Sequence, residues 1–278
     1  MYNSLYAKRG IFKNVISFIS PNFYYQLMKI YKIGNYEEMT QWINALRSIK
    51  MTHKIFRECD SNIWNDQLST IIDDLKYRIN INYAKRLSEK DQLKLQKIRD
   101  NIFVFIYDYF NKNHPEVEIV YYDTCEIYIC LDNIKNDNKL DFMMNHSDMI
   151  SRYMDTALKL YSEQEKLDTV INFEYESLIK TMLIDKPKYY LCHELKKYNV
   201  EQEAIYIRGF ADKRYEFTRY VINTLFLELS NTGNISNKTI ETLEHESSHR
   251  EDHDKIWKKK IVDRIIDPLL DIIKTNRN

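Results

Sequence analysis

The stretch VYYDTCEIYICLD, from Val120 to Asp132, decides how this chain folds. Runs of β-branched and aromatic residues stand on both sides of a short polar turn, and such residues favour extended strands. The pattern therefore predicts a β-hairpin. Asp123 lies at the turn and is followed by Cys125 and Glu126. The hairpin presents a carboxylate at its tip, so the residues around Asp123 determine which chemistry the turn can support.

The composition is typical of a folded protein. The chain has 278 residues, enough for one large domain or two smaller ones, and 44% of them are hydrophobic. With 41 basic and 41 acidic residues the formal net charge is zero, so any contact with nucleic acid must come from a local patch. The 22 tyrosines against 4 glycines and 4 prolines, with abundant Asn, Ile and Lys, are typical of AT-rich genomes such as those of many large DNA viruses.

Cysteine spacing and hydropathy favour an intracellular protein. No CxxC pair occurs among Cys59, Cys125, Cys130 and Cys192, so we expect reduced thiols without a disulfide framework or a cysteine-based zinc site. The N-terminus lacks the apolar core of a signal peptide, and no run of 18 apolar residues is present. We therefore expect no membrane span and no membrane partner, and the nucleus and a viral replication site both remain open as locations.

The first 115 residues are predicted to be mostly helical. Apolar residues at helical spacing favour helices over residues 11–33, with a restart at Pro21, and over residues 36–59, 62–82 and 88–113. The fourth helix should stop at His114, because the proline that follows disfavours helical backbone at that residue.

The remainder alternates strands and helices. We expect strands at residues 117–122, 126–131, 167–183, 188–192 and 204–208, and helices at residues 143–165, 215–229 and 254–273. Residues 230–234, SNTGN, should form the turn that ends the helix before them. Helices, then antiparallel strands with an intervening helix, then helices again, are the order of an α+β fold.

Five segments, in order, resemble the palm and thumb of family B (α-like) DNA polymerases. One of them, YYDTCE at residues 121–126, resembles the family's Tyr-Gly-Asp-Thr-Asp-Ser, with Tyr121, Asp123 and Thr124 matching. Cys125 stands where that family has a second aspartate, and Glu126 where it has a serine. The resemblance implies a polymerase-type palm sheet with packed helices and a helical thumb.

Two segments resemble the nucleotide-binding motifs of that family. YNSLYAKR at residues 2–9 resembles Asp-x-x-Ser-Leu-Tyr-Pro-Ser, and SIKMTHKIFRE at residues 48–58 resembles the helix Lys-x-x-x-Asn-Ser-x-Tyr-Gly. The implied nucleotide-binding residues are Ser4, Leu5, Tyr6 and Lys50. Met1 stands where the family has its metal-binding aspartate.

The last two segments resemble elements that grip the primer-template. FEYESLIKTMLIDKPKYYLC at residues 173–192 resembles the strands that lead to Lys-Lys-Arg-Tyr, and IYIRGFADKRYEF at residues 205–217 resembles Lys-Gly-x-Asp/Glu-x-x-Arg-Arg-Asp. The implied DNA-binding residues are Lys186, Lys188, Tyr189, Arg208, Gly209 and Arg214. Scattered surface charge is the alternative interpretation of these basic residues.

The departures from the motifs fall on the residues that polymerisation needs. Two metal ions clamp the attacking and leaving oxygens, and Mg²⁺ requires hard oxygen ligands, which a thiol serves poorly. Asp123 is retained as a vestigial catalytic and metal residue, whereas Met1 and Cys125 replace carboxylates. Glu126 should point to the opposite face, because side chains alternate along a strand. We therefore expect polymerase activity to be lost, with no cofactor other than Mg²⁺ if any activity remains.

The resemblance predicts a palm over residues 1–214, with a helical, finger-like insertion around residues 10–113, and a thumb-like helical domain over residues 215–278. The predicted function is a DNA-binding or scaffold protein of DNA replication, with primer-template DNA and other replication or virion proteins as partners. Two alternatives remain: an active DNA polymerase fragment, and a structural viral protein that reuses the palm fold.

HESSH, from His245 to His249, is a literal HExxH motif. On a helix this spacing places two imidazoles one turn apart for zinc, with Glu246 as general base. The surrounding ETLEHESSHREDHDK is polar nearly throughout, whereas a zinc-protease helix lies in a protein core. We therefore favour a solvated segment, with adventitious metal binding as the alternative.

Overall fold

A computed structural model describes residues 6–20, 22–42, 44–45, 48, 84–123, 125–131, 139–197, 200–209, 216–248 and 271. Within these ranges one sheet of seven strands has the order β1-β3-β4-β2-β5-β6-β7, and its neighbouring strands are antiparallel. The strands are β1 (Tyr6–Ala7), β2 (Gly10–Ile19), β3 (Glu118–Asp123), β4 (Glu126–Cys130), β5 (Glu174–Lys186), β6 (Tyr189–Lys197) and β7 (Val200–Arg208). The predicted α+β class and the predicted hairpin at the central turn are confirmed.

Strand β2 corrects the helix predicted over the start of residues 11–33. β2 lies in the middle of the sheet between β4 and β5, and its side chains are buried on both faces: Ile16 and Phe18 in one apolar cluster, Phe12 and Val15 in another. A strand buried on both faces shows a nearly continuous apolar run without alternation, which resembles part of a buried helix. The helical part of the N-terminal region therefore begins after residue 20.

The described helices are α1 (Phe23–Tyr31), α4 (Glu89–Asn113), α5 (Lys139–Gln164), α6 (Glu216–Thr232) and α7 (Asn237–Ser248), and residues 36–42 are also helical. Helix α4 begins where predicted, because the Ser88 hydroxyl accepts a hydrogen bond from the Asp91 backbone N–H at 3.2 Å. Helix α6 extends through residues 230–232, which were predicted as a turn, and α7 was not predicted. The helix predicted at residues 62–82 lies outside the described ranges, as does the helix predicted at residues 254–273 apart from residue 271.

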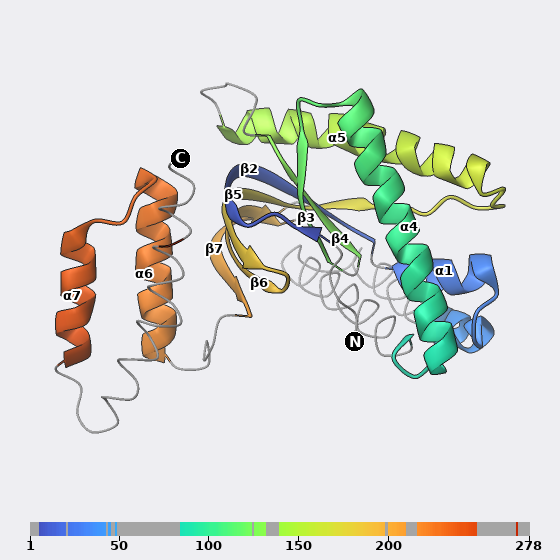
Figure 1. Ribbon diagram of the computed structural model, residues 1–278, viewed down its shortest axis with the longest axis horizontal. Helices are drawn as coiled ribbons and strands as arrows, with labels where there is room; N and C mark the ends of the chain where they lie inside the picture. Colours follow the sequence, from blue (N-terminus) through green and yellow to red (C-terminus); the bar gives the residue numbers. More distant parts are fainter. Residues whose placement is uncertain are drawn as a thin grey trace, which may run out of the picture.

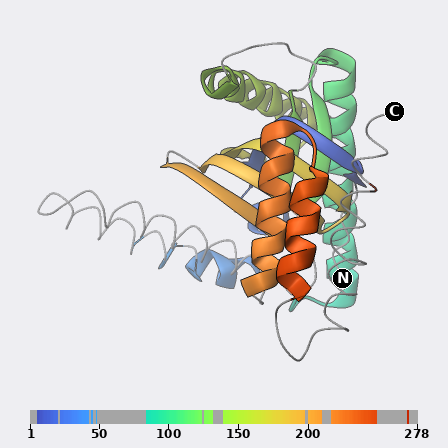
Figure 2. The same cartoon turned by 90° about the vertical axis from the view of Figure 1, so that its left-hand side faces the viewer.

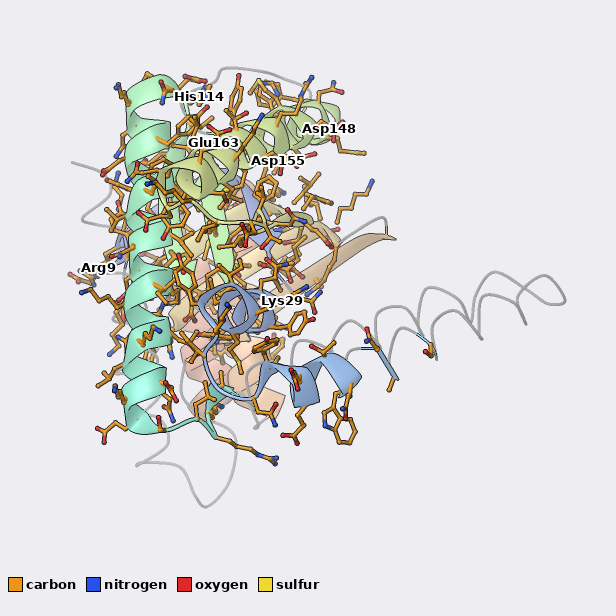
Figure 3. All side chains as sticks on the ribbon, turned by 90° about the vertical axis from the view of Figure 1, so that its right-hand side faces the viewer. Arg9, Lys29, His114, Asp148, Asp155 and Glu163 are labelled. Carbon is orange, nitrogen blue, oxygen red and sulfur yellow. The ribbon has the colours of Figure 1, made fainter. Side chains whose placement is uncertain are left out.

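Helices α1, α4 and α5 cover one face of the sheet at the end shown on the right of Figure 1. Their apolar side chains join those of β2, β3 and β4 in the largest cluster of buried residues. Phe103 of α4 stacks on Tyr122 of β3 with ring centroids 4.0 Å apart. In Figure 3, His114 marks the end of α4, Asp148, Asp155 and Glu163 mark α5, and Lys29 marks α1. None of the described helices is both long enough and apolar enough to cross a membrane.

Helix α6 packs on the other end of the sheet. Its residues Val221, Leu225 and Phe226 form a second apolar cluster with Leu191 of β6 and Ile207 of β7. Helix α7 lies beside α6 and runs back along it, and Figure 2 shows the two helices in front of the sheet. The sheet residues in this cluster thus come from β6, β7 and, through Leu183, β5, and Ile11 of β2 packs against it.

The opposite face of the sheet carries a group of tyrosines that we call the tyrosine face, defined by Tyr121, Tyr128 and Tyr190. These residues belong to a third buried cluster with Phe12, Val15 and other strand residues. Adjacent side chains of a strand point to opposite faces, so Tyr121 lies on this face whereas Tyr122 packs under α4.

The sheet is strongly curled around the tyrosine face. Strand β7 stands five places from β3 in the strand order, which is about 24 Å in a flat sheet at roughly 4.8 Å per strand. Yet the side chain of Arg208 in β7 lies 3.3 Å from that of Asp123 in β3. Register shifts interrupt the β2–β5, β5–β6 and β6–β7 pairings, and such bulges bend strands.

The central position of β2 predicts a large effect of truncating Ile16, which is fully buried. We expect Ile16→Ala to lower the free energy of unfolding by about 2–5 kcal/mol, because it leaves a cavity between the sheet and the helices. Val104 on α4 is 49% exposed, so Val104→Ala is the matched control and should change stability by less than about 0.5 kcal/mol. Urea unfolding of both variants measures these losses in the free energy of unfolding. Equally small losses for the two variants would contradict the buried, central position of β2.

Candidate functional site

The hairpin turn brings two carboxylates to the same face of the sheet. Strand β3 ends at Asp123, β4 begins at Glu126, and these two residues are directly opposite each other in the antiparallel pairing. Opposite residues of an antiparallel pair project to the same face. The expectation that Glu126 points away from Asp123 was therefore wrong, because the chain reverses between them and the alternation of a single strand does not continue through a turn.

The side chain of Cys125 packs on the helix-covered side of the sheet and not in the cluster of the tyrosine face. Its side chain is 2% exposed and belongs to the cluster between the sheet and helices α1, α4 and α5, together with Tyr122 and Ile127. Asp123 bonds to the tyrosine face instead. The side chain at the position that resembles the second family aspartate is thus part of the apolar core, and Glu126 is the acidic neighbour of Asp123.

Arg208 supplies the positive charge of the site. Its Nη2 lies 3.3 Å from Oδ2 of Asp123, and its Nη1 lies 3.8 Å from Oε2 of Glu126. The side chains of Asp123 and Glu126 are 1% and 11% exposed, and that of Arg208 is 29% exposed. Buried carboxylates require compensation, and one guanidinium provides it for both.

The three tyrosines hold these charged groups in place. The hydroxyl of Tyr121 donates to Oδ2 of Asp123 at 3.3 Å, and that of Tyr128 donates to Oε2 of Glu126 at 3.0 Å. Arg208 Nη1 donates to the Tyr190 hydroxyl at 3.3 Å. The rings of Tyr121 and Tyr190 have centroids 5.2 Å apart, so the network reaches from β3 across the curled sheet to β6 and β7.

A third carboxylate, that of Glu176, affects the protonation of Glu126. Glu176 of β5 accepts a hydrogen bond from the Ser17 hydroxyl at 3.3 Å and pairs with Lys197 at 3.5 Å. Burial, followed by the negative charge of Glu176, raises the pKa of Glu126 to about 7, although Arg208 opposes the shift. Burial opposes protonation of Arg208, but its acidic and tyrosine neighbours outweigh this and raise the pKa of the guanidinium.

The described part of the site does not fit a two-metal centre. A metal pair needs several hard oxygen ligands around a shared position, and here a guanidinium already pairs with Asp123 and lies near Glu126, whose raised pKa of about 7 leaves its carboxyl partly protonated near neutral pH. No group of three or more His, Cys, Asp or Glu side chains within the described ranges could hold a metal ion. Met1 lies outside those ranges.

Of the residues predicted to bind DNA, those that the structure describes lie near one another at one end of the sheet. In the β5–β6 turn, the Lys188 backbone N–H donates to the Tyr121 hydroxyl at 2.9 Å, and the Lys186 ammonium lies 4.3 Å from the centre of the Tyr189 ring. Gly209 has φ +79°, and a Cβ there would lie 2.0 Å from the Lys188 carbonyl oxygen, so only glycine fits. The turn thus packs directly against the end of β7.

Lys186 and Tyr189 are exposed, whereas Arg208 faces the buried carboxylates. The predicted DNA-binding set is therefore divided between a surface turn and an internal ion pair. Arg214 lies outside the described residues.

The predicted nucleotide-binding set is described only at Tyr6. This residue pairs with Tyr122 between β1 and β3, and its ring lies 5.2 Å from that of Tyr107 and 6.2 Å from that of Phe103 in α4. Burial raises the pKa of its phenol to about 12. Tyr6 thus packs on the helix-covered face, away from Asp123. Ser4, Leu5 and Lys50 lie outside the described residues.

The HESSH motif is described only in part. Helix α7 ends at Ser248, His245 is exposed on it, and His249 and His253 are not among the described residues.

Sequence reasoning missed Tyr128, Tyr190 and Glu176 as members of the site. The two-residue offset between Glu126 and Tyr128 could have indicated their shared face, as could the same offset between Tyr121 and Asp123. The positions of Tyr190 and Glu176 near Asp123 and Glu126 depend on how the sheet curls, and a local sequence pattern does not indicate that curl.

The fold resembles that of a solved polymerase. A comparison with solved structures finds the family B DNA polymerase from the hyperthermophilic archaeon Pyrobaculum calidifontis at a TM-score of 0.52 and 11% sequence identity. The match covers 89% of this chain and 34% of that chain, so the protein spans about a third of the polymerase. No protein-family model and no curated protein sequence matches. At this identity the comparison establishes a polymerase-like fold.

The internal ion pair predicts that removing Arg208 is costly. We expect Arg208→Met to lower the free energy of unfolding by about 3–5 kcal/mol, because two buried carboxylates lose their counter-charge. Arg9 pairs with Asp185 and Asp271 but is 44% exposed, so Arg9→Met should cost less than about 1 kcal/mol. Denaturant unfolding at neutral pH measures both, and similar losses would show that the Arg208 pair is not buried as described.

Glu126 predicts a specific pH dependence. Folding raises the pKa of this carboxyl from 4.5 to about 7, so the folded protein holds the proton more tightly than the unfolded chain. The stability from this group is complete below about pH 4.5 and is lost as the pH rises through about 7. Glu126→Gln removes the titration, so its stability relative to the wild type should increase between about pH 5 and about pH 8. Urea unfolding at each pH measures this difference in the free energy of unfolding. A difference that does not change with pH over this range would contradict the assignment.

Proposed function

We propose that this chain is a DNA-binding or scaffold protein of DNA replication, derived from a family B DNA polymerase and without polymerase activity. The observation that carries the proposal is the Arg208 guanidinium at 3.3 Å from Asp123 and 3.8 Å from Glu126. Catalysis by this class of enzyme requires carboxylates that hold metal ions at the reacting oxygens. Carboxylates already in contact with an internal arginine are poorly suited to that task.

DNA binding is supported by the surface of the β5–β6 turn. Lys186 and Tyr189 are exposed side by side, with the ammonium over the ring. Lysines neutralise phosphates, and an exposed aromatic ring can stack on a base, so the two together suit a nucleic-acid strand. Lys188 adds a second lysine to the same turn.

The proposed domain division follows from the same resemblance: a palm over residues 1–214, with an inserted helical segment, and a thumb-like region over residues 215–278. The packing of α6 on strands β5, β6 and β7 supports a helical unit seated at one end of the sheet. A viral origin and partners among replication or virion proteins belong to the same proposal.

Primer extension tests the absence of catalysis. We expect no nucleotide incorporation by the wild-type chain with Mg²⁺ or Mn²⁺, measured on a labelled primer-template beside an active polymerase. Cys125→Asp should also be inactive, because the Cys125 side chain packs in the core under the helices and not beside Asp123. Extension by the wild-type protein would reject this part of the proposal and favour an active polymerase fragment.

DNA binding is tested by the salt dependence of affinity for a primer-template, measured by fluorescence anisotropy. The double variant Lys186→Gln with Lys188→Gln should reduce the slope of log affinity against log salt by about 2, because each lost phosphate contact removes about 0.9. Lys94→Gln with Lys97→Gln on the exposed side of α4 removes the same charge elsewhere and should leave the slope unchanged.

Tyr189→Ala should weaken binding by about 1–3 kcal/mol without altering the salt slope, because it removes stacking and not charge. Equal effects of the two double variants would indicate binding by diffuse charge. A wild-type protein that does not bind DNA would favour a structural viral protein.

A further inference from the structure

The resemblance of the hairpin to a polymerase motif implies bound metal ions, but an arginine of the protein itself lies against its carboxylates. Asp123 of β3 and Glu126 of β4 project to the same face because they are a directly opposite pair. The Arg208 guanidinium lies 3.3 Å from Oδ2 of Asp123 and 3.8 Å from Oε2 of Glu126. A positive charge therefore already occupies the position that faces both carboxylates.

The guanidinium is also the most exposed of the three groups. The side chains of Asp123 and Glu126 are 1% and 11% exposed, whereas that of Arg208 is 29% exposed. Arg208 belongs to β7, the last strand in the sheet order, and reaches the hairpin because the sheet is curled. An ion that approached the two carboxylates along this side chain would meet the guanidinium first.

The two carboxylates require a cation beside them. Carboxylates lose water on burial and repel one another when they converge, and both costs fall when a positive charge is adjacent. Burial, with the charges of Glu176 and Asp123, raises the pKa of Glu126 to about 7, whereas Arg208 lowers it. Above that pH the Glu126 carboxyl is ionised, and the requirement for a cation beside it is greatest.

An arginine and a divalent cation meet this requirement in different ways. A single Mg²⁺ or Mn²⁺ ion, unlike the metal pair of a polymerase, can be held by one or two carboxylates while it retains several water molecules. A guanidinium brings one permanent positive charge and five N–H donors. It is also tethered to the sheet, so its effective concentration at the carboxylates is high, and a dissolved ion would have to displace it.

We propose that Arg208 is a built-in substitute for a metal ion: its guanidinium takes the place of a divalent cation at Asp123 and Glu126 and excludes such ions from the wild-type protein. The guanidinium supplies positive charge, but it cannot coordinate or activate an oxygen of a substrate as a metal ion does. The charge is therefore permanent and independent of the metal supply. The inference rests on the contacts of Arg208 and does not depend on the proposed role in replication.

Removal of the guanidinium should convert the two carboxylates into a binding site for a divalent cation. The full chain is titrated with Mn²⁺ above about pH 7, where Glu126 is ionised, and free Mn²⁺ is measured by electron paramagnetic resonance. Arg208→Ala should gain a saturable site that the wild type lacks. Arg208→Ala combined with Asp123→Asn should lose that site again, because an amide replaces one of the two charged ligands.

Arg9→Ala is the matched control. Arg9 also pairs with two aspartates, Asp185 and Asp271, but its side chain is 44% exposed. Exposed carboxylates stay hydrated and gain little from a nearby cation, so this variant should acquire no saturable site. An equal site in Arg9→Ala would show general binding of Mn²⁺ to surface carboxylates and would overturn the inference.

Urea unfolding with and without Mn²⁺ covers variants that fold poorly. An ion that binds only the folded chain stabilises it, so Mn²⁺ should raise the urea midpoint of Arg208→Ala and leave that of the wild type unchanged. Arg208→Gln is measured in parallel, because glutamine keeps part of the side-chain volume and its amide oxygen is a further hard ligand.

Three further results would overturn the inference. The first is Mn²⁺ binding by the wild type that Asp123→Asn abolishes. The second is a folded Arg208→Ala or Arg208→Gln that gains no site, or a gained site that survives Asp123→Asn. The third is that both variants stay unfolded in Mn²⁺, since the ion then does not replace the guanidinium. Neither measurement involves DNA or nucleotides, so failure here is distinct from failure of the proposed function.

Discussion

The ion pair between Arg208 and the carboxylates of Asp123 and Glu126 joins parts of the sheet that a flat sheet would keep far apart. It connects the last strand to the hairpin β3–β4 across a curled surface, at 3.3 Å and 3.8 Å. The two carboxylates share a face because the hairpin turn makes them a directly opposite pair. Their burial then requires a cation, and the curl of the sheet is what allows Arg208 to reach them.

The same curl explains why the tyrosine face is a core and not an open platform. Tyr121 and Tyr190 lie in strands four places apart in the sheet order, yet their ring centroids are 5.2 Å apart. Aromatic rings fill the concave side, and their hydroxyls bond to Asp123, Glu126 and Arg208. Buried polar groups are tolerated when each has a partner, so the tyrosines make the internal charges compatible with a packed interior.

Local sequence patterns predicted the helices and strands whose formation depends on residues close together in the chain. The hairpin at Asp123 was predicted from two β-prone runs, and α4 from helical spacing that stops at His114-Pro115. Strand β2 was missed because burial on both faces removes the alternation that marks a strand. Helix α7 was missed because its sequence, NKTIETLEHESS, is polar apart from Ile240 and Leu243, and two apolar residues are too few to establish a helical period.

The candidate site could be predicted only in part, since Asp123 was found by motif but its partners come from distant strands. Arg208 was assigned to DNA from its motif, whereas its side chain lies against two carboxylates. A phosphate that bound this guanidinium would have to displace Asp123 and Glu126 and leave them buried without a counter-charge, which is strongly unfavourable. Lys186 and Tyr189 are exposed, so a nucleic acid that reached them would not displace a buried carboxylate. The proposed loss of metal chemistry and the proposed nucleic-acid contact are therefore physically compatible in one chain, because the charges of Asp123 and Arg208 belong to the packed interior while the adjoining turn is exposed.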